Sequence, residues 1–543
     1  MEKIKKIINS QNTVKSATFI LVITLIASNF LGLLRDRFLA QRIPTDLLDT
    51  YYAAFRIPDL VFNILVLGAI SAAFIPVFTG FISKNKLQEA WKVTNSFLNI
   101  ILTLLIVFLI ILFFIMPWAI SKLVPDFNLE KQQMTVNLAR MFLISPIFFS
   151  ISYIFGGILN SFKRFLVYSL APLIYNLSII LATLFLTSRF SVYGVAIGVI
   201  CGAFFHMIIQ LPVVLKLGYR YCFLFDWHNK AVRKIGLLML PRAVGLGSMQ
   251  IMLMIYTALA STVSSGAVAV FNLADNIQTM PTVVFATSIA TAIFPTLSEQ
   301  ISLKKFSDFS SYVWRGIRTI IYILIPISVL IILLRAQIVR VILGSGYFGW
   351  EQTITTANTL GFFAISLVVQ GMIPLFARSF YALHNTKTPT IISIVSIIIS
   401  ILTAYFLIAK WGVLGLAISF SVGSFVNAIL LYLFLRKQVK ILTSFEYSGT
   451  IFFLKVLLSS LIMAFVIQIT KINIEPYIDM TRGWGVFSQL LISSLLGSLV
   501  YFVLTWLLRC EEFSEIKKII LTRFKLSSSK NKPDDNISGF NEH

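Results

Sequence analysis

Charged side chains interrupt several long hydrophobic stretches of this sequence. The candidates for a binding site are Arg35, Asp36, Asp49, Arg56, Arg242, Asp275 and Arg378. An ionised side chain is costly in hydrocarbon, so such residues usually face a polar cavity. A guanidinium stays charged and presents paired N–H donors that match phosphate oxygens. The arginines therefore predict a site for an anionic ligand, although Asp36, Asp49, Asp59 and Asp275 leave open a small hydrophobic cation.

Arg242 carries the strongest expectation of a functional role. It lies about eight residues into its hydrophobic stretch, which is roughly 12 Å at 1.5 Å per residue. It follows Pro241, which breaks the backbone hydrogen-bond ladder and can expose carbonyl groups to a cavity. Arg140 and Lys455 are better explained by long side chains that reach back to the membrane surface.

The elements that must position these residues are membrane-spanning helices. The 543 residues are 57% hydrophobic and 12% charged, against roughly 45–50% and 25% in soluble domains. The excess falls in blocks of about 20 residues, the length of helix that crosses the hydrocarbon core. We therefore predict an all-α polytopic membrane protein with about 14 transmembrane helices. They are placed at 17–40, 57–82, 95–120, 136–161, 166–187, 192–215, 235–260, 268–297, 314–335, 354–382, 388–408, 412–435, 450–469 and 485–508.

The basic residues of the chain indicate its orientation. The formal net charge is +23, and Lys and Arg lie mostly between spans, where they set topology and meet anionic headgroups. Nucleic acid is therefore not expected as a partner. Because the N-terminal segment, the even-numbered loops and the C-terminal tail carry most of these residues, we predict that both termini are cytoplasmic.

An internal repeat indicates two halves. Residues 193–216 align without a gap with 414–437, including Gly194 with Gly415 and Gly202 with Gly423. PDLVF at 58–62 weakly echoes PTVVF at 281–285. Both long segments are the sixth span of a six-span half, so the halves would form a parallel repeat. We expect a cytoplasmic segment (1–16), an N-lobe (17–216), a cytoplasmic linker (217–234), a C-lobe (235–437), two extra C-terminal helices (450–508) and a basic cytoplasmic tail (509–543).

Signatures of enzymes and metal sites are scarce in the sequence. It contains no Walker A motif, no HExxH, no GxSxG and no Cys/His cluster. The stretch from Gly344 to Gly349 fits G-x-G-x-x-G, but it joins two predicted membrane helices, so a turn is the simpler interpretation. We expect neither an enzyme nor a cofactor or metal.

Several motifs together resemble one family. SNFLGLLRDRFLA (28–40), LDTYYAAFRIPDL (48–60), GAISAAFIPVF (68–78), FNLADNIQTMP (271–281), FPTLS (294–298) and SFYALHNTKTP (379–389) are similar to the MurJ/MviN family of the multidrug/oligosaccharidyl-lipid/polysaccharide exporter superfamily. The resemblance covers nearly the whole chain. It implies a V-shaped two-lobe fold whose last two helices form a lipid groove. It also implies a flippase of the bacterial cytoplasmic membrane that moves lipid II, an undecaprenyl-pyrophosphate-linked precursor, to the outer leaflet by alternating access.

The match extends to Arg35, Asp36, Asp49, Arg56 and Asp275, but three positions depart from the family pattern. Asn29, Phe62 and Asn276 stand where better-known members carry arginine. We expect Arg35, Arg56 and Arg242 to bind the pyrophosphate and Asp36 and Asp275 to orient them through ion pairs, with Arg378 as a further cation.

Other functions remain open from the sequence. The nearest are an exporter of another lipid-linked oligosaccharide and a multidrug exporter of the same superfamily. From other classes come a membrane glycosyltransferase, which the short outer loops disfavour, and a scaffold for division enzymes. Expected partners are lipid II or a related glycan, membrane lipids, and cell-wall synthesis or division proteins.

Overall fold

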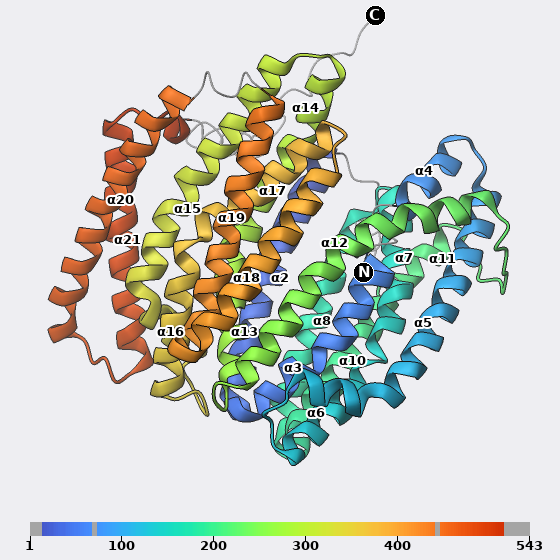
Figure 1. Cartoon of the computed structure of the whole chain (residues 1–543), viewed down its shortest axis with the longest axis horizontal. Helices are drawn as coiled ribbons and strands as arrows, with labels where there is room; N and C mark the ends of the chain where they lie inside the picture. The colour runs from blue at the N-terminus through green and yellow to red at the C-terminus, as the bar shows by residue number, and fades with distance from the viewer. Residues whose placement is uncertain (1–13, 68–72, 440–445, 515–543) are drawn as a thin grey trace, which may run out of the picture.

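The computed structural model describes residues 14–67, 73–439 and 446–514, which form an all-helical bundle (Figure 1). The N-terminal half contains α2 (Val14–Arg42), α3 (Thr45–Val61), η1 (Phe62–Leu67), α4 (Ile75–Ser83), α5 (Leu87–Leu123), α6 (Leu129–Phe142), α7 (Ser145–Ser161), α8 (Phe165–Phe185), α9 (Thr187–Phe190), α10 (Val192–Ile208) and α11 (Leu211–Lys216). The C-terminal half contains α12 (Lys230–Ser261), α13 (Ala267–Pro281), η3 (Thr282–Thr287), α14 (Ser288–Ser302), α15 (Phe306–Leu343), α16 (Trp350–Ile365), α17 (Leu367–Ala382), α18 (Lys387–Trp411) and α19 (Val413–Gln438). After it come α20 (Glu446–Ile474), η5 (Glu475–Tyr477) and α21 (Gly483–Leu507).

The helices confirm a multi-pass membrane protein but not the full count of spans. Within the described residues, 10 helices are long and apolar enough to cross a membrane, or up to 11 if the pair α16 and α17, bent by 48°, is one span. The predicted spans at 17–40, 57–82 and 235–260 fall on α2, on α3 to α4 and on α12, which do not pass that test. Parts of these three stretches, including the side chains of 14–19 and residues 68–72, lie outside the described residues that were compared with a membrane span.

Two π-helical segments occur at related places in the two halves. The segment η1 begins four residues after Pro58, and η3 begins directly after Pro281. Proline removes a backbone donor and opens the helical ladder, and the wider π turn is one way to absorb that break. The two prolines head the PDLVF and PTVVF motifs, so the weak sequence echo corresponds to the same local backbone in both halves.

The longer repeat also has matching backbone geometry. Ser191 before α10 has φ 48° and ψ −134°, and Gly412 before α19 has φ 54° and ψ −133°. A Cβ on Gly194 would lie 2.8 Å from the carbonyl of Leu186, and one on Gly415 would lie 2.7 Å from that of Leu407. Each glycine therefore permits the same close turn between its helix and the preceding one.

The ends of the bundle differ in their loops. Loops at 84–86, 162–164, 217–229 and 303–305 lie at what we call the basic end, toward the top of Figure 1. Loops at 43–44, 124–128, 262–266 and 344–349 lie at the opposite end.

The buried apolar side chains are organised differently at the two ends. At the opposite end, one continuous core joins α2, α3, α6 and α10 to α12, α13, α15 and α16. Toward the basic end, one core surrounds Trp91 and Phe97 of the N-terminal half. A second core surrounds Tyr322 and Phe380 of the C-terminal half. Among the described residues, no buried side chain belongs to both of these basic-end cores.

Helix α12 connects the two halves in space as well as in sequence. Figure 1 shows it running obliquely between the two groups of helices. Near its start, Val232 and Ile235 pack in the core around Trp91. Near its end, Tyr256 and Ala260 pack in the shared core. The helix therefore contacts the N-terminal half at the basic end and the joined region at the opposite end.

Candidate functional site

Polar side chains of both halves meet where the shared core begins. The Nε and Nη2 atoms of Arg35 donate to Asp36 Oδ1 at 3.1 and 2.9 Å, and its Nη1 donates to Asn176 Oδ1 at 3.2 Å. The other Asp36 oxygen accepts from Asn276 Nδ2 at 2.8 Å. Asp36 is buried, and both of its oxygens have partners. Its carboxylate therefore links α2 of the N-terminal half to α13 of the C-terminal half.

Arg56 makes a second link between the halves. Its side chain reaches from α3 to Thr257 of α12, where Nε donates to Oγ1 at 2.7 Å, and to Asn272 of α13, where Nη2 donates to Oδ1 at 2.6 Å. The residue is only 7% exposed. Both acceptors are neutral, and within the described residues no carboxylate lies within ion-pair distance of this guanidinium. A charged donor bound only by neutral oxygens is suited to exchange them for an anion.

A cluster that we call the opposite-end latch joins α3 to the start of α13. The Asp49 carboxylate is 0% exposed and accepts from the backbone N–H groups of Gly266 at 2.7 Å and Ala269 at 2.8 Å. Lys131 of α6 donates to it at 2.9 Å. Free N–H groups and the helix dipole make a helix start favourable for an anion. Asp49 thus caps a helix of the other half.

The exposed edge of the latch contains Asp46. Its carboxylate accepts from Lys131 Nζ at 2.5 Å and from the hydroxyl of Ser265. The latch therefore comprises Asp46, Asp49, Lys131, Ser265, Gly266 and Ala269.

The end of α2 is attached to the end of α15 in a complementary way. The Arg37 guanidinium donates to the carbonyls of Val341 and Ile342, so a cation meets the negative end of a helix dipole. Tyr347 N donates to Gln41 O at 3.3 Å. Gly346 has φ 60°, and a Cβ there would lie 2.0 Å from that same carbonyl. The G-x-G-x-x-G stretch is thus a loop packed closely on α2.

The predicted site residues do not all come together. Arg35, Asp36, Asp49, Arg56 and Asp275 lie along the junction of the halves. Arg378 is hydrogen-bonded to none of them in the described residues, and its Nη1 donates to Thr287 O at 3.0 Å, at the end of η3. The side chain of Arg242 lies outside the described residues, so its role stays a prediction.

The expected ion pair of Asp275 stays a prediction, because the side chain of Arg242 lies outside the described residues. Among the described residues Asp275 forms no ion pair, and instead accepts from Gln278 Nε2 of its own helix at 2.9 Å. The expected ion pair of Asp36 is present. Arg56 gives two of its five N–H donors to Thr257 and Asn272.

The three departures from the family pattern have different surroundings. Asn276 donates to Asp36 across the junction. Asn29 donates to Leu25 O of its own helix at 2.8 Å. Phe62 packs on Phe149 and Tyr153, with ring centroids 5.3 Å away in each case. Asn276 is therefore a structural member of the site, whereas Phe62 belongs to an aromatic cluster of the N-terminal half.

Sequence reasoning missed Lys131, Asn176, Thr257 and Asn272. Lys131 lies in a polar stretch just outside a predicted span, and the other three are neutral, so no signal of charge in hydrocarbon marks them. Asn272 could have been found, since it precedes Asp275 by three residues and helical spacing places both on one face.

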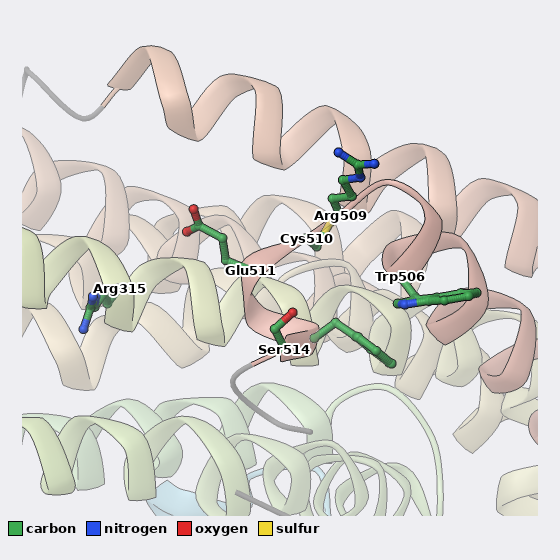
Figure 2. A pocket seen from close by; sticks show the side chains of 7 residues that line it. Arg315, Trp506, Arg509, Cys510, Glu511 and Ser514 are labelled. Atoms are coloured by element: carbon green, nitrogen blue, oxygen red, sulfur yellow. The ribbon is translucent and has the colours of Figure 1, made fainter. Parts of the chain in front are cut away.

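A cavity of about 470 Å³ lies at the basic end of α15 and α21. Figure 2 shows Arg315, Trp506, Arg509, Cys510, Glu511 and Ser514 around it, and Phe513 completes the lining. It contains none of the predicted site residues. Arg318 nearby pairs with Glu511 at 3.1 Å and with Glu512, so this region is the polar end of an otherwise apolar pair of helices. Among the described residues, no group of three or more His, Cys, Asp or Glu could hold a metal ion.

Solved structures identify the fold. "Lipid II flippase MurJ, inward closed conformation" matches with a TM-score of 0.76 at 24% identity, covering 90% of this chain and 98% of that one. "Inward-facing conformation of a multidrug resistance MATE family transporter of the MOP superfamily" matches with a TM-score of 0.68 at 16% identity, covering 79% and 99%. The chain therefore has the helical fold that these two proteins share.

Sequence comparison then identifies the family. A family model described as "Lipid II flippase MurJ" matches residues 44–493. The "Probable lipid II flippase MurJ" of Rickettsia prowazekii (strain Madrid E) is 27% identical over 512 residues, which cover 93% of this chain and 99% of the relative. The chain belongs to the lipid II flippase MurJ family.

Proposed function

We propose that this chain carries lipid II from the cytoplasmic to the outer leaflet of the bacterial cytoplasmic membrane by alternating access. Family membership supports lipid II as the substrate. The contacts of Arg56 carry the mechanistic part of the proposal. This arginine holds the halves together through two neutral acceptors, which a diphosphate can replace.

Substrate binding and opening are coupled through that exchange. Hydrogen bonds between ionised partners are roughly twice as strong as neutral ones. A pyrophosphate bound to Arg56 and Arg35 takes N–H donors away from Thr257, Asn272 and Asn176. The contacts between α3, α12 and α13 weaken at the same time. In this mechanism Arg242 supplies a further cation from α12, and Asp36 keeps Arg35 oriented.

The halves are arranged as two moving bodies in this proposal. The N-lobe spans residues 17–216, the linker 217–234 and the C-lobe 235–437. Fourteen spans arise when α2, the α3–η1–α4 stretch and α12 each cross the membrane alongside the other helices. The basic end is the cytoplasmic end, and both termini, including the tail at 509–543, lie on that side.

The orientation has its own test. A reporter fused after Lys234 or after Asn385 should report the cytoplasm, and one fused at Gly346 should report the outside. An external signal at residue 234 contradicts the arrangement of two parallel halves.

The α20–α21 pair, residues 450–508, serves as the groove for the lipid tail. Both helices pack against α15, and they expose large apolar side chains such as Phe465 and Leu499. Arg509 and Arg315 at their basic end place cations at the depth of the headgroups. An apolar track with a basic end matches a lipid with a diphosphate head.

Transport of lipid II by the purified protein tests the function. In liposomes it should move lipid II between leaflets without ATP, because the sequence contains no phosphate-binding loop. Undecaprenyl pyrophosphate carrying a different glycan serves as the comparison substrate. Strict ATP dependence, or faster movement of the other glycan than of lipid II, contradicts the proposal.

A further inference from the structure

The linker between the halves lies against α5 as an extended segment. We call Tyr219–Trp227 the aromatic strap; it runs along the right edge of Figure 1 beside α5. Asn95 Nδ2 donates to Arg220 O at 2.9 Å, and Asn99 Nδ2 donates to the carbonyls of Cys222 and Leu224, both at 3.1 Å. Three alternate carbonyls of the strap are therefore bound by these two asparagines, and Ser96 Oγ donates to the next one, Asp226 O, at 3.3 Å.

Further contacts fix the register of the strap. Tyr219 Oη donates to Asn95 Oδ1 at 2.7 Å, and Tyr221 Oη donates to Asn99 Oδ1 at 3.0 Å. Ser96 Oγ accepts from Asp226 N at 2.8 Å. Asn95, Ser96 and Asn99 are all buried. The hydrogen bonds described for these three buried polar side chains of α5 thus all go to the strap.

The strap also presents a row of exposed aromatic rings, the first of which, Tyr221, still reaches Asn99 through its hydroxyl. Tyr221, Phe223, Phe225 and Trp227 are 60%, 77%, 39% and 51% exposed. Residues two apart in an extended chain lie on the same side. The Phe223 and Phe225 rings confirm this, since their centroids are 5.2 Å apart. Such a row of exposed aromatic rings needs a partner surface.

The position on α5 indicates what that surface is. Helical spacing places Asn95 and Asn99 on the same face as Ile106, Ile110 and Phe113. Those three apolar side chains are exposed, within a helix that is long and apolar enough to cross a membrane. The strap therefore lies over the same side of α5 that faces lipid further along the helix, at the basic end. Asn99 lies about 10 Å from Ile106 along the helix axis, at 1.5 Å per residue.

The charges around the strap are mostly positive. The flanking cations are Lys216, Arg220, Lys230, Arg233 and Lys234, against a single carboxylate at Asp226. That carboxylate already accepts from His228 N at 3.1 Å. Aromatic rings are enriched where a membrane meets water, and basic clusters bind anionic headgroups.

We propose that the aromatic strap is an anchor that binds the anionic headgroup layer of the leaflet at the basic end. The rings insert at the boundary of headgroups and acyl chains, and the flanking cations contact lipid phosphates. The anchor holds the start of α12, because Val232 and Ile235 follow the strap directly and pack in the core around Trp91. This inference does not depend on which substrate the protein carries.

Depth measurements on a spin label test the proposal without any transport assay. Cys201, Cys222 and Cys510 are replaced by Ser, and a nitroxide is attached to Phe223→Cys. A label on Ser307→Cys, an exposed residue at the start of α15 at the same end, is the control. In nanodiscs containing phosphatidylglycerol, the label at 223 should collide more with oxygen and less with a water-soluble nickel chelate than the label at 307. Replacing phosphatidylglycerol by phosphatidylcholine should move it toward water.

A second variant separates the charges from the rings. Lys216→Gln, Arg220→Gln and Lys230→Gln together should remove most of the difference between the two lipids and leave the depth in phosphatidylcholine unchanged. If the label at 223 collides with the nickel chelate as often as the label at 307 in both lipids, the anchor proposal is overturned. The row of rings would then be the site of a protein partner. Equal depth in both lipids, or a triple variant that still responds to phosphatidylglycerol, overturns the role of anionic headgroups.

Discussion

The two ends of the bundle are held in different ways. At the opposite end a shared apolar core joins the halves, and charged groups bind helix termini across the junction. At the basic end each half has its own core. At the basic end the described buried contacts between these cores and the other half are those of Val232 and Ile235 of α12 with the core around Trp91, whereas the opposite end must lose many contacts to open. The structure is therefore closed at the opposite end, and its opening requires that specific polar contacts are replaced.

The free-energy change that opening requires is similar in size to what those polar contacts contribute. Shifting a two-state equilibrium from 1:99 to 99:1 takes about 5.5 kcal/mol. Hydrogen bonds to charged groups contribute about 1.5–3 kcal/mol each. The contacts of Arg56 and Asp36 across the junction are few but together reach this range. A substrate that accepts the hydrogen bonds of these donor groups in place of their present partners can therefore shift the equilibrium from the closed to the open state.

The largest effect is expected from Arg56, because it both joins the halves and supplies a cation. Arg56→Ala should abolish complementation in a depleted host, with normal levels of protein in the membrane. The variant loses two hydrogen bonds from a charged donor, which contribute about 1.5–3 kcal/mol each, enough to lower flipping by roughly a hundredfold. Arg56→Lys should recover only part, since an ammonium lacks the planar fork that reaches both Thr257 and Asn272.

Arg140→Ala is the matched control for this prediction. The Arg140 guanidinium stacks on the Phe113 ring, 4.5 Å from its centroid, within the N-terminal half. Its loss should be tolerated. Normal growth of Arg56→Ala at normal membrane levels contradicts the assigned role.

A smaller effect is expected at the opposite-end latch. Asp49→Asn removes the charge that accepts hydrogen bonds from Lys131 and from two backbone N–H groups. It should shift the equilibrium between the closed and open states toward opening by about 1–3 kcal/mol. Spin labels on Asp126→Cys and Ser264→Cys lie on either side of the latch, in a background without the three native cysteines. Their distance distribution should broaden toward longer values.

Asp46→Asn tests whether burial explains that effect. Asp46 contacts the same Lys131, but its carboxylate is about half exposed. Exposed ion pairs contribute about 0–1 kcal/mol, so the distribution should change little. Equal broadening in both variants would show that the buried position of Asp49 has no special importance.

The sequence predicted the fold class and part of the site for identifiable reasons. Charges are rare in apolar stretches, so Arg35, Asp36, Asp49, Arg56 and Asp275 stood out, and the structure brings them to one junction. The motifs that carry the resemblance include all five of these residues, and the family model confirmed the membership. The paired prolines of PDLVF and PTVVF also marked a real feature, since each leads into a π-helical segment.

The rest depends on tertiary contacts that periodicity does not encode. Nothing in the sequence around Asp49 indicates that its partners are backbone N–H groups more than two hundred residues away. Asn276 was interpreted as a lost cation, yet it is a donor to Asp36. Arg378 looked equivalent to the other arginines but binds the carbonyl of Thr287, which helical periodicity did not predict. The aromatic strap was predicted only as part of the cytoplasmic linker at 217–234, because its contacts with α5 join residues more than a hundred positions apart.

The central claim is that the opposite end must open for lipid II to cross. Asp46 and Ser265 are exposed, in contact and on different halves, so Asp46→Cys with Ser265→Cys in a background without native cysteines can form a disulfide across the latch. The oxidised double variant in liposomes should stop flipping lipid II, and reduction should restore the rate. Each single variant should be indifferent to oxidant. A fully cross-linked protein that flips lipid II as fast as the reduced one would contradict the account.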